Sequence, residues 1–321
     1  MNKNDLLKIQ NLKVHYKKNG ESIPAVDDVS FVINEKEVLA LVGESGCGKT
    51  TLALSILKLL PQESLSLFEG KIIFQEKNLL ELDEVNLRKI RGRRISMIFQ
   101  EPKTALNPVF TIGEQLGEVL SQHSDLKEDK LKKSVIEILK EVGIPSAEER
   151  FSYYPHQLSG GQAQRVMITM AILGSPNLLI ADEPTTALDV TIQAQILELL
   201  NKLKEKKGLS ILLITHDISI LEEIADSVAI MFKGKLLEYC DVDTFFKNPL
   251  HPYTIELINS VPRLGFNKVK VGIQTRERDN VKLLSRCVYL NRCSRADAIC
   301  MREESQFIEI EKEHFVNCLL V

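Results

Sequence analysis

Short runs of alternating hydrophobic and polar residues open the chain, as in LKIQNLKVHY and VSFVI, and the continuous apolar run VLALV follows them. Alternation with a period of two predicts half-buried strands, and a short unbroken apolar run predicts a buried strand. After a glycine-rich loop, the spacing in TTLALSILKLL predicts a helix from Thr50 that ends before Pro61. The first part of the chain therefore predicts strands that lead into a strand–loop–helix unit.

The middle of the chain changes to helical spacing. IIFQ and RISMIFQ predict two more strands, and residues from about 104 to 172 then predict a helical insert. Beyond it, NLLIADEP, SILLITHD and SVAIMFKGKLLEY predict strands, with the helix TIQAQILELLNKLKEK after the first of them. Buried strands that alternate with helices predict an α/β fold with a parallel sheet.

A change of pattern near residue 250 divides the chain. NPLHPYTIELINSVPR contains three prolines, and the polar stretch GFNKVKVGIQTRERDN after it is predicted to be a linker. We therefore expect a catalytic domain over residues 1–250 and a C-terminal extension over residues 251–321.

Composition limits the classes of protein to which the chain can belong. The chain has 321 residues, 44% of them hydrophobic, which is enough for a sizeable core. Lysine and arginine number 41 against 44 acidic residues, so no overall charge favours nucleic acid or an acidic membrane. We find no secretory signal and no apolar run long enough to span a bilayer, and expect a soluble, cytosolic protein. Six cysteines in such a protein favour metal binding or free thiols over disulfides.

The glycine-rich loop predicts a phosphate site. Residues 43–50, GESGCGKT, fit the pattern G-x-x-x-x-G-K-[ST] between a predicted strand and a predicted helix. Glycines let backbone N–H groups face the phosphates, Lys49 reaches the β- and γ-phosphates, and Thr50 offers its hydroxyl to Mg²⁺. We interpret Cys47 as a small loop residue and not as a reactive thiol.

Two further stretches suit nucleotide chemistry. In LLIADEP, an apolar strand ends in Asp182, predicted to hold Mg²⁺ through water, and Glu183, predicted to be the general base. In LSGGQ, Ser159 suits a helix N-cap, and Gly160 and Gly161 expose amides to an anion.

Together with TTALD and THD, these stretches resemble an ATP-binding cassette (ABC) ATPase over residues of about 6–250. The resemblance implies a P-loop fold with a helical subdomain, and a head-to-tail dimer in which LSGGQ contacts ATP held by the neighbouring subunit. It implies that the residues that bind nucleotide are Tyr16, Gly43, Ser45, Gly46, Cys47, Gly48, Lys49, Thr50, Thr51, Gln100, Ser159, Gly160, Gly161, Gln162, Asp182 and Asp189. Thr50, Gln100 and Asp182 are the implied Mg²⁺ ligands.

The same resemblance assigns individual roles. Gln100 resembles the glutamine that contacts Mg²⁺ and water, and Asp189 resembles a residue that crosses the dimer interface. Tyr16 resembles the aromatic that stacks on adenine, and an ordinary strand tyrosine is the alternative. His216 resembles the switch histidine that contacts the γ-phosphate and helps position Glu183, and a structural histidine is the alternative.

The flanking segments narrow the family. QEPKTALNPVFTIGEQLGE at 100–118 and HPYTIELINSVPR at 251–263 resemble the ATPases of oligopeptide/dipeptide (peptide/nickel) importers. This implies an ATP-hydrolysing motor on the cytoplasmic side of the cell membrane. Its implied partners are a second ATPase in a heterodimer, two permeases and an extracellular substrate-binding protein, with no nucleic acid. Nickel or a metal chelate is the alternative cargo, and a soluble ABC ATPase that acts on ribosomes or DNA is the alternative class.

Cysteines gather at the C-terminal end of the chain as Cys287, Cys293, Cys300 and Cys318. Their spacing matches neither the usual zinc pairs nor ordinary ferredoxins. Some members of the importer family that this chain resembles bind an iron–sulfur cluster through cysteines with similar spacing. A [4Fe–4S] cluster, a zinc ion and unligated thiols are the three interpretations, with His314 as a substitute ligand.

Overall fold

The computed structural model describes residues 5–123, 127–186, 188–260 and 287–321. They form two compact units, each made of separate stretches of chain. Unit 1 combines Met1–Leu6, Asn34–Lys36 and Glu81–Ile214, and unit 2 combines Leu7–Ile33, Glu37–Leu80 and Thr215–Val321. Among the described helices, none has the length and apolar character needed to cross a bilayer.

The centre of unit 1 is a set of parallel strands. They are β6 (Ile95–Ile98), β7 (Leu178–Asp182) and β8 (Ser210–Thr215), and β7 pairs in parallel with both of the others. Every residue of the three strands is buried. The parallel arrangement predicted from the unbroken apolar runs is therefore confirmed for this unit.

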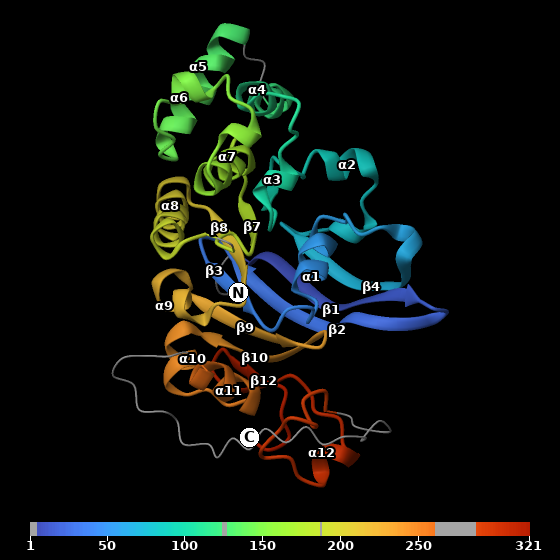
Figure 1. The fold of residues 1–321 in the computed structure, drawn as a ribbon. Coiled ribbons are helices and arrows are strands. Elements are labelled where there is room, and N and C mark those ends of the chain that lie inside the picture. The colour runs from blue at the N-terminus through green and yellow to red at the C-terminus, as the bar shows by residue number, and fades with distance from the viewer. Residues whose placement is uncertain (1–4, 124–126, 187, 261–286) are drawn as a thin grey trace. The chain divides into compact units, whose positions relative to one another are not determined.

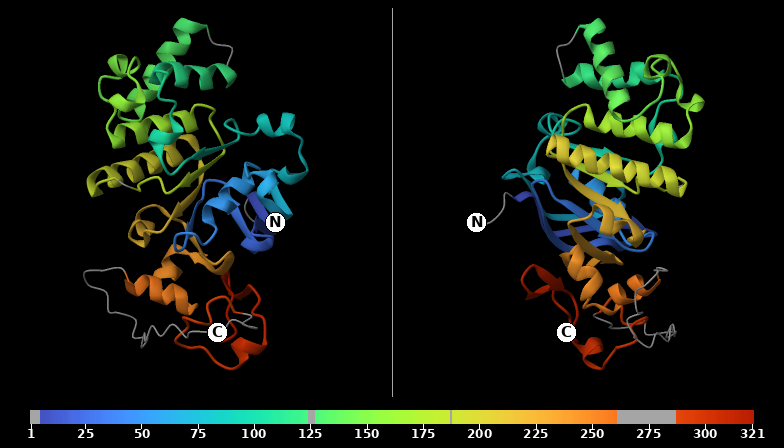
Figure 2. Two further views of the ribbon diagram at one scale, coloured as in Figure 1. Left: turned by 45° about the vertical axis from the view of Figure 1, so that its right-hand side comes forward. Right: turned by 90° about the vertical axis from the view of Figure 1, so that its left-hand side faces the viewer.

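Helices make up the rest of unit 1. They are α2 (Glu84–Arg88), α3 (Pro102–Ala105), α4 (Ile112–His123), α5 (Glu128–Glu141), α6 (Ala147–Arg150), α7 (Gly160–Ile172) and α8 (Val190–Lys207), with a 3-10 turn at Pro155–Gln157. The predicted helical insert corresponds to α4–α7. Helices α7 and α8 lie side by side (Figure 2), and Arg165 Nη2 of α7 donates to Gln195 Oε1 of α8 over 2.9 Å.

Unit 2 contains a four-stranded sheet in the order β2-β1-β4-β5. Its strands are β1 (Asp5–Lys18), β2 (Glu21–Asn34), β4 (Leu65–Phe74) and β5 (Lys77–Asn78), and the three long ones lie next to one another in Figure 1. β4 runs antiparallel to β1 and β5. The alternation in the sequence appears as alternating burial, with Leu7, Ile9, Leu12 and Val14 of β1 buried.

A second set of strands in unit 2 carries the phosphate loop at one end and the C-terminal segment at the other. β3 (Val38–Val42) pairs in parallel with β9 (Ser227–Phe232), and β10 (Lys235–Asp241), β12 (His314–Val316) and β11 (Ile308–Glu311) continue from β9 with antiparallel pairing. The helices of unit 2 are α1 (Lys49–Ile56), α9 (Leu221–Ile224), α10 (Val242–Lys247), α11 (Pro252–Ser260) and α12 (Ile299–Arg302), with 3-10 turns at Gln62–Ser64, Leu79–Glu81 and Ile218–Ile220.

The C-terminal extension continues this sheet. Strand β12 adds to β10, with Glu238 opposite Val316, and the proline-containing stretch after residue 250 forms helix α11 from Pro252. Proline suits a first helical turn because its missing N–H is not needed there. The predicted linker lies within residues 261–286, outside the described residues. The domain boundary at residue 250 stays a prediction.

Candidate functional site

The phosphate loop of unit 2 connects β3 to α1 and requires glycine at two positions. A Cβ on Gly43 would lie 2.1 Å from the backbone oxygen of Met231, so a side chain has no room there. Gly48 caps α1 with a φ of 112°, a left-handed conformation that glycine adopts without strain. A Cβ at Gly48 would also lie 2.1 Å from the backbone oxygen of Ala25. Close packing therefore sets the path of this loop.

Lys49 begins α1 and turns back onto its own loop. Its Nζ donates to the backbone oxygens of Gly43 at 2.8 Å and Glu44 at 3.0 Å, and only 5% of the residue is exposed. Cys47 is also buried, and burial raises the pKa of its thiol even though Lys49 acts in the opposite direction. A protonated, buried thiol agrees with the interpretation of Cys47 as a small loop residue.

Tyr16 lies beside the first turn of α1. Its hydroxyl is 3.5 Å from Thr51 Oγ1, the residue two positions after Lys49, and its ring is partly exposed. Thr50, the predicted Mg²⁺ ligand, is exposed in the same turn. The structure thus brings the predicted adenine-stacking residue and the phosphate helix together, and their contact with a nucleotide stays a prediction.

The two predicted carboxylates of unit 1 stand where β7 ends. Asp182 is the last residue of β7 and is buried, and Glu183 follows it with a φ of 48°. This left-handed conformation is unusual for a residue with a long side chain. The Glu183 backbone N–H donates to Ile214 O at 2.9 Å, which holds the strained residue at the strand end. Strain of this kind concentrates at functional sites.

Two side chains of unit 1 orient the Glu183 carboxylate. Gln100 Nε2 donates to Glu183 Oε2 at 3.0 Å, and Thr186 Oγ1 donates to the same oxygen at 2.9 Å. The structure therefore brings together two residues that the sequence analysis assigned separately, Gln100 and Glu183. It adds Thr186, which belongs to the TTALD stretch but was given no role in the sequence analysis.

The LSGGQ stretch forms the N-terminus of α7 as predicted. Ser159 is the N-cap, its side chain accepts from Gln162 N at 3.3 Å, and Gln162 Oε1 accepts from Ser159 N at 3.2 Å. This reciprocal pair is a capping box. The two glycines differ: a Cβ at Gly161 would lie 2.8 Å from Ile192 of α8, whereas a Cβ at Gly160 would have no neighbour closer than 3.7 Å. Packing within the chain explains Gly161 but not Gly160.

The remaining predicted residues lie at element ends. Asp189 is the N-cap of α8, where its Oδ1 accepts from Ile192 N at 2.9 Å, a role that was not predicted. His216 directly follows β8 and is exposed. Their predicted contacts, across a dimer interface for Asp189 and with the γ-phosphate for His216, stay predictions.

The four C-terminal cysteines of unit 2 meet in one small cavity. Cys287, Cys293, Cys300 and Cys318 all line it, together with His251 and Tyr289. Burial raises the pKa of the Cys287, Cys293 and Cys318 thiols, and the neighbouring thiols raise it further. His251 is fully buried, and its Nδ1 accepts from Tyr253 N at 3.0 Å. The cysteines separated by up to 31 positions in the sequence are therefore neighbours in space.

His314, predicted as a substitute ligand, takes part in a different buried group. Its Nε2 lies 2.8 Å from Glu238 Oε1, and Glu238 also accepts from Leu250 N and His251 N at 2.8 and 2.9 Å. Glu238, Cys240 and His314 are the only described residues of metal-binding type found as a group with ligand atoms within 4.8 Å of one another. Burial raises the pKa of the Cys240 thiol. A carboxylate with three hydrogen bonds beside a neutral thiol is a structural network that joins β10, β12 and the start of α11.

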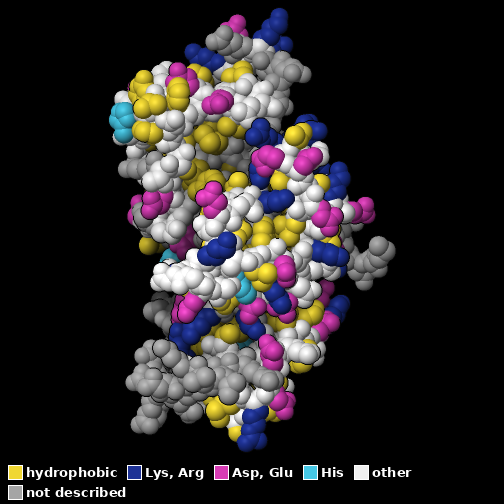
Figure 3. All heavy atoms as spheres, turned by 90° about the vertical axis from the view of Figure 1, so that its right-hand side faces the viewer, with side chains coloured by type: hydrophobic (Ala, Val, Ile, Leu, Met, Phe, Trp, Pro, Cys, Tyr) yellow, Lys and Arg dark blue, Asp and Glu magenta, His cyan; other side chains and the backbone are white. Residues whose placement is uncertain are grey.

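Unit 1 also exposes large apolar side chains after β6. Phe99, Val109 and Phe110 are 42%, 71% and 49% exposed, and Tyr154 before LSGGQ is 39% exposed. Hydrophobic side chains are visible on the upper part of the face in Figure 3, the height occupied by the helical segment in Figure 1. Exposed apolar groups of this size often mark a docking surface.

Known proteins resemble the chain over nearly its whole length. Residues 26–186 match the family described as ABC transporter, and residues 237–300 match the family described as oligopeptide/dipeptide transporter, C-terminal region. The dipeptide transport ATP-binding protein DppD of Bacillus subtilis (strain 168) is 44% identical, over 98% of this chain and 94% of its own length. The oligopeptide transport ATP-binding protein AppD of the same organism is also 44% identical, over 98% and 96%.

A solved structure agrees in fold. The dimeric post-hydrolysis structure of the ATP-binding cassette MJ0796, bound to ADP and phosphate, has a TM-score of 0.66 and 30% identity over 74% of this chain and 98% of that one. This agreement confirms the predicted cassette fold. The match to the ABC transporter family makes the chain an ATPase, with ATP and Mg²⁺ as the general ligands of that family. The chain belongs to the ATP-binding proteins of the ABC transporter family, in its oligopeptide/dipeptide branch.

Proposed function

We propose that this protein is the ATP-hydrolysing motor of an importer for oligopeptides or dipeptides. One observation carries the proposal: a single chain combines the ABC transporter match at 26–186 with the oligopeptide/dipeptide C-terminal match at 237–300. The names of the two Bacillus subtilis relatives, which specify dipeptide and oligopeptide transport, support the choice of cargo over nickel or a metal chelate.

The predicted nucleotide-site residues divide between ATP binding and ATP hydrolysis. The Gly43–Thr51 loop binds the phosphates through its amides and Lys49, and Tyr16 stacks on the adenine. Thr50, Asp182 and Gln100 hold Mg²⁺, which neutralises charge on the phosphates. Glu183 accepts a proton from the attacking water, and His216 contacts the γ-phosphate. The hydrogen bonds from Gln100 and Thr186 support this role for Glu183, because they hold its carboxylate in one orientation.

The LSGGQ stretch acts on a second chain. Gly160 has room for a side chain within its own protein, so its lack of one is explained by a ligand that approaches from outside. We assign that ligand as ATP held by a partner ATPase, with Ser159 and Gly160 at its γ-phosphate and Asp189 at the interface. The dimeric state of MJ0796 supports this arrangement. The partner is a second ATPase subunit in a heterodimer.

The exposed apolar side chains contact the membrane components. Phe99, Val109 and Phe110 are exposed apolar side chains of unit 1, and a short helix of a permease would remove them from water. The protein thus sits at the cytoplasmic side of the cell membrane through two permeases, and an extracellular binding protein delivers the peptide. ATP binding closes the ATPase dimer and hydrolysis reopens it, which drives alternating access.

The cysteine cavity holds a [4Fe–4S] cluster. Four cysteines that line one cavity match the four thiolates that such a cluster needs. A single zinc ion would hold sulfurs about 3.8 Å apart, given its tetrahedral geometry and bond length. Among the described residues, the only three metal-binding side chains whose ligand atoms all lie within 4.8 Å of one another are Glu238, Cys240 and His314. No three sulfurs of the cavity cysteines lie that close together, so their spacing does not match a single zinc ion. The cluster would supply a structural crosslink, and import requires no electron transfer.

Two preparations test these assignments. Affinity purification of the tagged protein from membranes is expected to recover two permeases and a second ATPase, together with a binding protein that binds peptides. Recovery of ribosomal proteins without permeases would contradict the proposed role in transport. Recovery of a binding protein that binds nickel and no peptide would contradict the proposed cargo. Anaerobic purification is expected to yield about four irons and four sulfides per chain, lost in Cys300→Ser. An iron-free, stable, wild-type protein would eliminate the cluster.

A further inference from the structure

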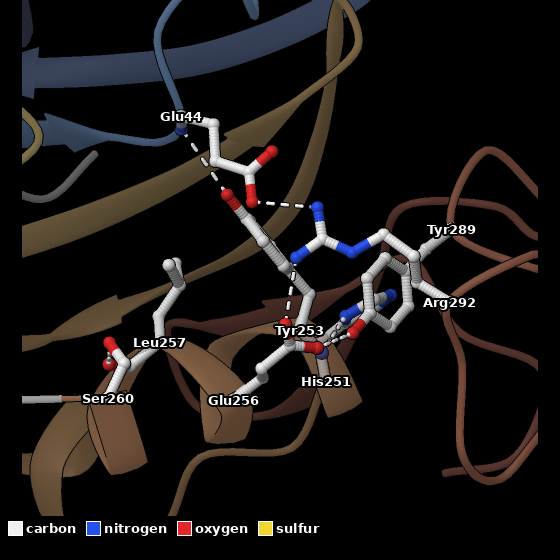
Figure 4. Close-up of polar contacts among 8 residues, drawn as sticks. All are labelled: Glu44, His251, Tyr253, Glu256, Leu257, Ser260, Tyr289 and Arg292. Carbon is white, nitrogen blue, oxygen red and sulfur yellow. Dashed lines mark hydrogen bonds and ion pairs between the residues drawn. The ribbon is translucent and has the colours of Figure 1, made fainter. Parts of the chain in front are cut away.

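Glu44, the second residue of the phosphate loop, is held through all three of its polar groups. Its backbone oxygen accepts from Lys49 Nζ at 3.0 Å, and its backbone N–H donates to Tyr253 Oη at 3.3 Å. Its carboxylate Oε1 accepts from Arg292 Nη1 at 2.7 Å. Figure 4 shows Glu44 in contact with Tyr253 and Arg292, two residues from the C-terminal part of the chain.

Arg292 is the centre of this arrangement. Its second nitrogen, Nη2, donates to Glu256 Oε1 of α11 at 2.7 Å, and Tyr289 Oη donates to Glu256 Oε2. The guanidinium carbon lies 5.6, 5.9 and 5.8 Å from the ring centres of Phe232, Tyr253 and Tyr289. A planar guanidinium that bridges two carboxylates among aromatic rings is fixed in position more firmly than a lone surface arginine.

The sequence position of Arg292 connects this arrangement to the cysteine cavity. Arg292 immediately precedes Cys293, and Tyr289 both lines the cavity and contacts the guanidinium. All these residues belong to unit 2, as do Glu44 and Lys49. A continuous series of contacts therefore runs from the cysteine cavity through Tyr289, Arg292 and Glu44 to Lys49.

Two physical effects follow from the Arg292–Glu44 pair. The guanidinium compensates a carboxylate that would otherwise repel the phosphates of ATP, and it limits the motion of a loop that must be ordered to bind them. The side chains of Arg292 and Glu44 remain 32% and 44% exposed, so solvent weakens the pair. The effect on nucleotide affinity is therefore moderate.

We propose that Arg292 is a positioning residue of the nucleotide site, through which the cysteine-rich segment orders the phosphate loop and raises its affinity for ATP. The proposal rests on the assigned role of Lys49 and its loop in binding ATP. It does not depend on which metal, if any, the cysteines hold.

The test measures binding of a fluorescent, non-hydrolysable ATP analogue with Mg²⁺ to the full chain. Arg292→Met, which keeps the apolar stem on the rings, is expected to raise the Kd about three- to fivefold, and Arg292→Lys less. Arg295→Met is the matched control, because Arg295 lies in the same segment and its Nη2 donates to Leu320 O and not to the phosphate loop. We expect its Kd to equal that of the wild type.

A double-mutant cycle separates positioning from general destabilisation. In a Glu44→Gln background, Arg292→Met should change the Kd less than twofold, because the charge that Arg292 compensates is gone. High salt should also reduce the difference between wild type and Arg292→Met. A purely structural Arg292 would lower the melting temperature and leave the Kd unchanged, or would change the Kd equally in both backgrounds. Either result overturns the proposal.

Lys49→Ala shows whether only the positioning role of Arg292 is wrong or whether the assignment of the phosphate loop to ATP binding is also wrong. If Lys49→Ala abolishes binding while Arg292→Met leaves it unchanged, only the positioning role of Arg292 is wrong. If Lys49→Ala leaves binding unchanged, the assignment of the loop is itself wrong.

Discussion

The side-chain amide of Gln100 donates a hydrogen bond to Glu183 Oε2 over 3.0 Å, and the two residues follow neighbouring parallel strands, β6 and β7. Glu183 adopts a left-handed backbone conformation, and its N–H is bonded to Ile214 O. The strand pairing, the strained backbone and the amide together fix the direction of one carboxylate. A general base needs such a fixed direction more than it needs basicity.

Replacing Glu183 by glutamine removes the proposed general base and keeps the size of the side chain. We expect Glu183→Gln to bind ATP normally and to lose at least about 10²-fold in turnover, because proton acceptance contributes that much. Phosphate release by the assembled transporter, with analogue binding measured in parallel, checks this. The control is Glu148→Gln, which removes an exposed carboxylate paired with Lys140 and should retain full turnover. Normal turnover in Glu183→Gln would remove Glu183 from its role.

Thr186 is predicted to position Glu183. Thr186→Val removes the hydroxyl that donates to Glu183 Oε2 while keeping the shape of the side chain. Turnover should fall about tenfold with unchanged nucleotide affinity, because a misplaced group can cost up to about 10²-fold. Thr186→Ser keeps the donor and should stay close to wild type. Equal activity of the valine and serine variants would contradict the positioning role.

Replacing each of the two glycines of the LSGGQ stretch by alanine should have different effects on stability and on ATP turnover. Gly160→Ala has space within the chain, so the melting temperature should not change, whereas Gly161→Ala would place a Cβ 2.8 Å from Ile192 and lower it. Despite its normal stability, Gly160→Ala should lose about tenfold or more in ATP turnover of the assembled complex, because it blocks an amide donor. Full turnover in Gly160→Ala would argue against an external phosphate at this helix.

His251 makes stability depend on pH. Burial lowers its pKa to about 4, with Glu238 acting in the opposite direction. Because the unfolded chain binds this proton near pH 6.5 and the folded chain only near 4, His251 costs no stability above pH 6.5. As pH falls from 6.5 to 4, the free energy of unfolding decreases by up to about 3 kcal/mol.

His251→Asn tests this dependence, because asparagine can also accept from Tyr253 N. Urea unfolding at pH 7 and pH 5 should show a smaller loss of stability for the variant than for the wild type. Identical losses would mean that His251 titrates normally in the folded protein.

Local sequence patterns were sufficient to predict the local structure of the segments that carry the proposed nucleotide-site residues. The phosphate loop, the carboxylates after β7 and the Ser159 cap each depend on residues within a few positions, so spacing alone indicates them. The contacts that link these pieces were not predicted. Arg292 and Glu44 are 248 positions apart, and no periodicity encodes such a pair.

The C-terminal segment was the least predictable part. Its cysteine spacing left three interpretations open, and the structure adds that all four line one cavity. His314 and His251 are both buried, and no sequence pattern indicates that His251 is the histidine that lines the cysteine cavity. Strand β12 has only three residues, and its partner β10 lies about 76 positions earlier in the chain. A strand this short has too weak a sequence pattern to predict this pairing.

Peptide uptake by the reconstituted transporter tests the central claim most directly. The chain is assembled in liposomes with its permeases, partner ATPase and binding protein, with ATP on the side of the ATPases. Peptide should accumulate only with ATP and Mg²⁺, and Glu183→Gln should stop accumulation while the complex stays assembled and still binds ATP. Accumulation at the wild-type rate in Glu183→Gln, or without ATP, would contradict the account of this protein as the motor.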